Sequence, residues 1–137
     1  MGIEINKIEH IGIAVKSLDH SIPLFERLLG SKCYKIEEVL DQFVRTAFFA
    51  VDKVKIELLE SLSEDGPIAN FIAKNGEGIH HIAFKVNNTD TSLQNAKKSG
   101  FKLIDFSSRQ GADGMQIGFL NPRSTNGCLI ELCSNGK

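Results

Sequence analysis

Two residue types that bind metal ions and move protons recur at matched places along the chain. His10 and His81 lie 71 residues apart, and Glu57 and Glu131 lie 74 residues apart. Imidazole nitrogens and carboxylate oxygens together suit divalent ions such as Zn²⁺, Co²⁺, Ni²⁺, Mn²⁺ or Fe²⁺. We therefore interpret these four residues as candidate ligands of a single ion that leaves coordination positions open for substrate oxygens.

The matched spacing belongs to an internal repeat. The paired stretches are His-Ile-Gly-Ile-Ala-Val at 10–15 with His-Ile-Ala-Phe-Lys-Val at 81–86, Phe48 with Phe119, and Ile-Glu-Leu at 56–58 with Ile-Glu-Leu at 130–132. Three residues are extra in the second copy, near Asn126-Gly127, which is a hairpin-turn signal. The repeat predicts two modules, about 5–65 and 66–135, in a single domain spanning 1–137.

The glutamates occupy an unusual position within the repeat. Each one lies between an isoleucine and a leucine whose side chains point to the opposite face of a strand. A carboxylate in such an apolar strand must be paired, protonated or metal-bound, because an isolated buried charge is costly. A single histidine in a strand is more often a hydrogen-bonded structural residue than a ligand. Repetition of both residue types at matched places favours the metal interpretation.

Hydrophobic periodicity predicts the elements that carry these residues. In the first module it predicts strands at 7–15, 33–39, 44–50 and 54–62, with a helix at 18–29 that Gly30 closes, and then a bridging helix at 67–74. In the second it predicts strands at 78–86, 102–105, 116–120 and 128–133, a helix at 90–99, and a loop at 107–114 that is a candidate lid. The order βαβββ, twice over, predicts an α+β fold with a curved mixed sheet around a metal cavity.

Composition excludes several classes of function. The chain has 137 residues, 24% of them charged, and a formal net charge of −1, so we expect no nucleic-acid partner. No apolar run is long enough to span a membrane, and the N-terminal residues lack the order of a signal peptide. Three scattered cysteines do not form a disulfide framework. We expect a cytoplasmic protein with no membrane partner.

The sequence resembles the vicinal-oxygen-chelate superfamily, which includes glyoxalases, extradiol dioxygenases and methylmalonyl-CoA epimerases. The resemblance is strongest to the epimerases and covers essentially the whole chain. It rests on the histidine motif at 10–15, Gly-Pro-Ile-Ala-Asn-Phe-Ile at 66–72, Gly-Glu-Gly-Ile-His-His-Ile-Ala-Phe at 76–84, and the run at 119–132 that contains Asn-Pro-Arg-Ser-Thr-Asn-Gly. The double histidine together with this final run is fairly specific.

The resemblance implies a ligand set and a cofactor. His10, His81 and Glu131 correspond to metal ligands, and Glu57 is a fourth ligand at a position where some epimerases carry glutamine and glyoxalases carry glutamate. The implied cofactor is one divalent ion, Co²⁺ first, with Ni²⁺, Zn²⁺ or Mn²⁺ as alternatives. The implied partners are an acyl-CoA thioester substrate and a second copy of the chain in a homodimer.

The activity implied is interconversion of (R)- and (S)-methylmalonyl-CoA. The metal would stabilise the enolate that forms when the proton on C2 leaves, and carboxylates would carry that proton. Glu131 is the candidate catalytic carboxylate, and Glu57 or a water is its partner on the opposite face. Thr46 stands where some epimerases carry a glutamate proposed as a proton carrier, so the two-base assignment stays open.

Other residues and other functions remain in contention. Arg109, Arg123 and Lys102 either meet the CoA phosphates or are ordinary solvated cations, and His80 is a structural or supporting residue. A glyoxalase I would use the His, Glu, His, Glu set even better than an epimerase does. A non-catalytic small-molecule-binding protein of the same fold is the third hypothesis, and it predicts a cavity without metal.

Overall fold

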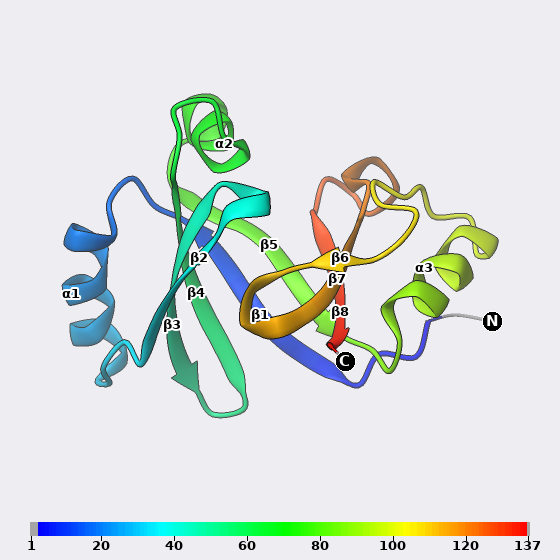
Figure 1. Ribbon diagram of the computed structural model, residues 1–137, viewed down its shortest axis with the longest axis horizontal. Helices are drawn as coiled ribbons and strands as arrows, with labels where there is room; N and C mark the ends of the chain where they lie inside the picture. The colour runs from blue at the N-terminus through cyan, green and yellow to red at the C-terminus, as the bar shows by residue number, and fades with distance from the viewer. Residues whose placement is uncertain (1–2, 137) are drawn as a thin grey trace. The chain divides into compact units, whose positions relative to one another are not determined.

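The computed structural model describes residues 3–136, which form two compact units (Figure 1). Residues 10–80 make one unit, and residues 81–136 make the other together with residues 3–9. The division falls within β1 (Lys7–Ala14) and within β5 (Gly78–Lys85), so each of these strands contributes to both units. A single domain with modules at 5–65 and 66–135 stays a prediction.

The unit of residues 10–80 contains the first βαβββ repeat and the bridging helix. Its elements after β1 are α1 (Leu18–Leu29), β2 (Lys35–Val39), β3 (Val44–Val51), β4 (Val54–Ser61) and α2 (Pro67–Asn75). The strand order is β1–β4–β3–β2, with β1 parallel to β4 and the other pairs antiparallel. Figure 1 shows α1 alongside β3 and β4.

The other unit repeats this topology. Its elements after β5 are α3 (Thr89–Lys98), β6 (Arg109–Gln110), β7 (Met115–Leu120) and β8 (Ile130–Asn135). The strand order is β5–β8–β7–β6, with β5 parallel to β8 and the other pairs antiparallel. Mixed sheets with helices on one face confirm the α+β class and the duplicated βαβββ order.

One predicted strand is wrong. Residues 102–105 form only an isolated bridge, between Leu103 and Leu120, and β6 lies instead inside the segment predicted as a loop. The amides of Ile104 and Asp105 both donate to the carbonyl of Phe119, and the Asp105 carboxylate accepts the Phe119 amide at 2.8 Å. A side chain thus takes a position that a backbone carbonyl would occupy in a regular ladder, so no strand is continued here.

The predicted lid is tied to its surroundings. Ser108 donates to the Asp90 carboxylate through its backbone amide at 2.6 Å and through its hydroxyl at 2.9 Å. Gln110 pairs with Gln116 across β6 and β7. These bonds attach residues 108–110 both to the first turn of α3 and to β7.

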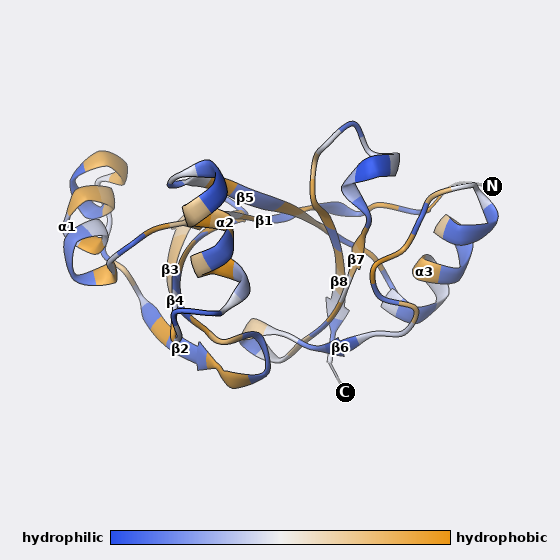
Figure 2. Cartoon of the chain, turned by 90° about the horizontal axis from the view of Figure 1, so that it is seen from above, coloured by the Kyte–Doolittle hydropathy of each residue, from blue (hydrophilic) through white to orange (hydrophobic). Residues whose placement is uncertain are grey.

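Helix α1 covers one face of its sheet. Its Leu18 packs with Val15, Ala47, Phe49 and Leu58 in a buried cluster. Gly30 closes the helix in the left-handed conformation, with φ of 69°, which glycine adopts without strain. Figure 2 shows the hydrophobic and hydrophilic stretches of α1, whereas α3 is mostly hydrophilic with a smaller apolar part.

The start of α1 depends on a side-chain cap. The Ser17 hydroxyl accepts a hydrogen bond from the backbone amide of His20 at 3.2 Å. We expect Ser17→Ala to lower the free energy of unfolding by about 1 kcal/mol, because a helix N-terminal amide loses its partner. Urea denaturation measures this, with Ser31→Ala, an exposed serine beyond the helix, as the matched control. Equal midpoints for the two variants would contradict the capping role.

The remaining unit uses α3 in the same way. Leu93 and Ala96 of α3 pack with Val86, Leu120 and Leu132. On the opposite face of this sheet, a second cluster contains Ala83, Met115, Ile117, Phe119 and Cys133. Each sheet therefore has one face under its helix and one face directed away from it. None of the helices within residues 3–136 has the length and hydropathy needed to cross a bilayer.

Candidate active site

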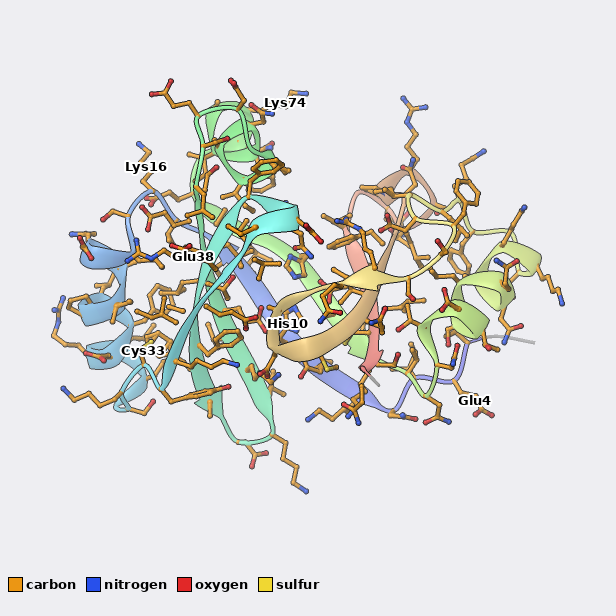
Figure 3. The ribbon with its side chains drawn as sticks, in the orientation of Figure 1. Glu4, His10, Lys16, Cys33, Glu38 and Lys74 are labelled. Carbon is orange, nitrogen blue, oxygen red and sulfur yellow. The ribbon has the colours of Figure 1, made fainter. Side chains whose placement is uncertain are left out.

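His10 and Glu57 form a buried pair in the unit of residues 10–80. His10 lies on β1 (labelled in Figure 3), and the parallel strand β4 carries Glu57 opposite Gly12. The imidazole Nδ1 lies 3.3 Å from a carboxylate oxygen, and both side chains are more than nine-tenths buried. Because Ile56 and Leu58 pack beneath α1, alternation directs Glu57 to the face away from the helix.

His81 and Glu131 form the equivalent pair in the other unit. β5 carries His81, and β8 carries Glu131 opposite Ala83. The imidazole Nε2 lies 3.1 Å from a carboxylate oxygen, again with both side chains buried. Leu132 packs under α3, so Glu131 also points to the face away from its helix. The structure thus brings together the predicted residues as two matched His–Glu pairs, one in each unit.

The geometry within each pair fits the ligands of a divalent ion. Two ligand atoms bound at about 2.1 Å and about 90–109° apart at the metal are roughly 3.0–3.4 Å from each other. The observed separations of 3.3 and 3.1 Å lie in this range. An imidazole N–H that donates to a carboxylate gives a contact of the same length. What favours ligation is the duplication, since both pairs have the same residue types, burial and place in the strand order.

A phenylalanine lies opposite each glutamate on the neighbouring strand. Phe48 on β3 is the register partner of Glu57, and Phe119 on β7 is the register partner of Glu131. The Phe119 ring meets His81 edge-on at 5.7 Å between ring centroids. These apolar neighbours lower the local dielectric around the carboxylates, which strengthens their interaction with a cation. The Phe48 and Phe119 match in the repeat was the sequence signal for them.

The remaining candidates lie outside the two pairs. His80 is half-buried, and its ring stands edge-on to Phe71 of α2 at 4.8 Å, which supports a packing role. Arg109 pairs with Asp105 at 3.2 Å, and its guanidinium lies over the Phe119 ring. Arg123 and Lys102 are exposed. One residue was not singled out from the sequence: Glu9, next to His10, is also buried, although its own neighbours in sequence gave no signal of this.

Comparison with known proteins decides the family. Residues 9–119 match the glyoxalase/bleomycin resistance protein/dioxygenase superfamily. The chain belongs to this superfamily. Its members' βαβββ duplication is the one seen here in the identical strand orders of the two units.

Individual members of the superfamily are similar over nearly the whole chain. The uncharacterized protein YqjC of Bacillus subtilis is 44% identical, covering 93% of this chain and 91% of that protein. An ethylmalonyl-CoA/methylmalonyl-CoA epimerase of Cereibacter sphaeroides is 34% identical, covering 93% of this chain and 97% of the epimerase. A solved methylmalonyl-CoA epimerase in complex with methylmalonyl-CoA and NH₄⁺ is 31% identical, with a TM-score of 0.89 and coverage of 96% of each chain.

Proposed function

We propose that this protein is a metal-dependent epimerase that interconverts (R)- and (S)-methylmalonyl-CoA. The observation that carries the proposal is the duplicated buried His–Glu pair on the helix-free face of each sheet. Its support from related proteins is similarity to epimerases over more than nine-tenths of the chain. The substrate class that follows is an acyl-CoA thioester.

We propose that His10, Glu57, His81 and Glu131 hold one divalent ion. Two imidazoles and two carboxylates are a donor set that Co²⁺, Ni²⁺, Zn²⁺ and Mn²⁺ all accept, and the resemblance to epimerases puts Co²⁺ first. When bound, such an ion supplies a Lewis-acid charge that stabilises negative charge developing on the acyl oxygens. Sharing one ion between the repeats explains why both copies retain the same two residue types.

The chain's own carboxylates would move the proton. In a methylmalonyl thioester, C2 lies between the thioester carbonyl and the free carboxylate, so loss of its proton leaves charge that both groups share. We assign removal of the C2 proton to the Glu131 carboxylate, and delivery of a proton to the opposite face of C2 to Glu57 or a water. No atoms other than that proton are exchanged, so the reaction needs no oxidant or second substrate.

Glyoxalase I is the second candidate, and one observation favours it. Glu57 lies 3.3 Å from His10, which suits a four-residue ligand set of the glyoxalase kind. That enzyme would also move a proton between two carbons, but on the adduct of methylglyoxal and glutathione. The similarity to epimerases across the chain makes the thioester substrate our first proposal. We further propose that the protein acts in the cytoplasm as a homodimer.

Incorporation of deuterium tests the activity directly. With Co²⁺-loaded protein in D₂O, we expect rapid exchange of the C2 proton of methylmalonyl-CoA, followed by mass spectrometry, and no turnover of the methylglyoxal–glutathione adduct. Prior treatment with a chelator should remove the exchange, and added Co²⁺ should restore it, because the developing charge loses and regains its stabilising cation.

The same experiment separates the three hypotheses. Turnover of the glutathione adduct without exchange on methylmalonyl-CoA would establish the glyoxalase reading. Metal-free protein that binds small molecules and catalyses neither reaction would establish the non-catalytic one. Exchange at the rate of buffer alone would end the epimerase proposal.

A further inference from the structure

Thr46 on β3 has a buried hydroxyl without a partner. The residue is 1% exposed, and no group within residues 3–136 forms a hydrogen bond with its Oγ1. Burying a hydroxyl without a hydrogen bond is unfavourable, so such a group calls for an explanation. The other side chains on its strand do not provide one, because its neighbours along the same face, Val44 and Phe48, are apolar.

The second repeat shows that the fold itself does not need this hydroxyl. At the repeat's spacing of 71 residues, Thr46 corresponds to Ile117 on β7. The register agrees, since Thr46 pairs with Leu59 of β4 as Ile117 pairs with Cys133 of β8. Ile117 is 3% exposed and packs in an apolar cluster. An aliphatic side chain therefore fills this position well, and the hydroxyl at Thr46 has a purpose other than packing.

Thr46 lies on the face that carries the His–Glu pair of its unit. Ala47 and Phe49, its neighbours in parity, pack under α1, so Thr46 and Phe48 point to the opposite face. Phe48 is the register partner of Glu57, which makes Thr46 the diagonal neighbour of Glu57. Diagonal partners in an antiparallel pair are about 7–8 Å apart. A short acyl group over Glu57 is therefore within reach of the hydroxyl.

We propose that the Thr46 hydroxyl donates a hydrogen bond to the free carboxylate of the acyl-CoA substrate and so positions the acyl group. A hydrogen bond to a charged acceptor is roughly twice as strong as a neutral one, which offsets the burial of the hydroxyl. This inference rests on the proposed function and adds a residue that selects thioesters bearing a second carboxylate. Thr46 is thus a substrate-contacting residue rather than a base.

Access to Thr46 has a structural basis. The residue directly opposite it on the edge strand β2 is Glu37, which is only half-buried and forms an ion pair with Lys35 at 3.6 Å. Side chains in such partly exposed ion pairs rearrange at little cost. Their displacement when the substrate binds would open the hydroxyl to the carboxylate.

Two substitutions test the role of the hydroxyl. Thr46→Val keeps the shape and removes the hydroxyl, whereas Thr46→Ser keeps the hydroxyl. We expect Thr46→Val to raise the Tm by a few degrees, because an unsatisfied polar group is removed. We expect the same variant to weaken methylmalonyl-CoA binding, as KM and as Kd from calorimetry, about tenfold or more, while Thr46→Ser stays within about threefold of wild type. Propionyl-CoA, which lacks the carboxylate, is the matched ligand and should bind both variants as it binds wild type.

Each other result counts against the inference. A lower Tm for Thr46→Val would show that the hydroxyl has a structural partner, such as a buried water. Unchanged methylmalonyl-CoA binding, or an equal loss for propionyl-CoA, would overturn the contact with the carboxylate while the wild-type activity leaves the proposed function intact. A wild-type protein that neither binds methylmalonyl-CoA nor exchanges its C2 proton overturns both proposals.

Discussion

Glutamine in place of Glu131 is expected to slow C2 proton exchange on methylmalonyl-CoA by about 10²- to 10⁴-fold, the usual contribution of a general base. Glutamine retains a carbonyl oxygen that can ligate, so we expect the variant to keep its bound ion. The change isolates the ability to carry a proton from the ability to bind metal. Deuterium incorporation and metal content, measured on the same sample, give the two readouts.

Glu38→Gln is the control for this substitution. Glu38 is an exposed residue of β2, labelled in Figure 3, and its replacement should leave both readouts unchanged. Full metal content with exchange within tenfold of wild type in Glu131→Gln would contradict proton transfer by Glu131. Loss of the metal together with the exchange would reduce Glu131 to a ligand alone.

Substitution of either buried histidine should remove the metal ion. We expect His10→Ala and His81→Ala each to weaken Co²⁺ binding by at least about 100-fold, since loss of even a group that supports a ligand costs about 10- to 100-fold. Epimerase activity should fall to background in both. The equality of the two losses is the point, because one shared ion depends on both repeats, whereas separate sites would respond to one substitution each.

A histidine outside the pairs controls for general effects. His20 lies exposed in the first turn of α1, so His20→Ala should keep full metal content and activity. Equilibrium dialysis with Co²⁺ measures affinity and stoichiometry for all three variants. Retention of one full equivalent of Co²⁺ by His10→Ala, or by His81→Ala, would argue against the shared site.

The repeat made much of this fold predictable. Equal spacing of His10 with His81 and of Glu57 with Glu131 led to the βαβββ duplication, and the structure has the same strand order in each unit. Alternation around each glutamate predicted its face correctly, because leucine and isoleucine neighbours pack under a helix while the carboxylate points away. Strong periodicity at a fixed spacing carries information that a single motif lacks.

The segment before β7 was not predictable in the same way. A strand at 102–105 followed from its apolar residues, but the Asp105 carboxylate occupies the Phe119 amide and prevents a regular ladder. Ser108 bonded to Asp90 likewise holds what looked like a free loop. Contacts of this kind join residues far apart in sequence, and local propensity does not contain them.

The hydroxyl of Thr46 illustrates a second limit. From the sequence, Thr46 was only a departure from the pattern of related epimerases. Its lack of a hydrogen-bond partner emerges from the packing around it, and the register then identifies Ile117 as its counterpart. Burial and hydrogen bonding, taken together, turned a difference in sequence into a testable contact.

Anomalous diffraction from crystals of the Co²⁺-loaded protein tests the central claim most directly. The account predicts one anomalous peak per chain, with an imidazole nitrogen of His10 and of His81 and a Glu131 oxygen each about 2.0–2.2 Å from it. Two peaks per chain, one at each His–Glu pair, or a single peak bound by only one histidine, would contradict a metal ion shared by the two repeats.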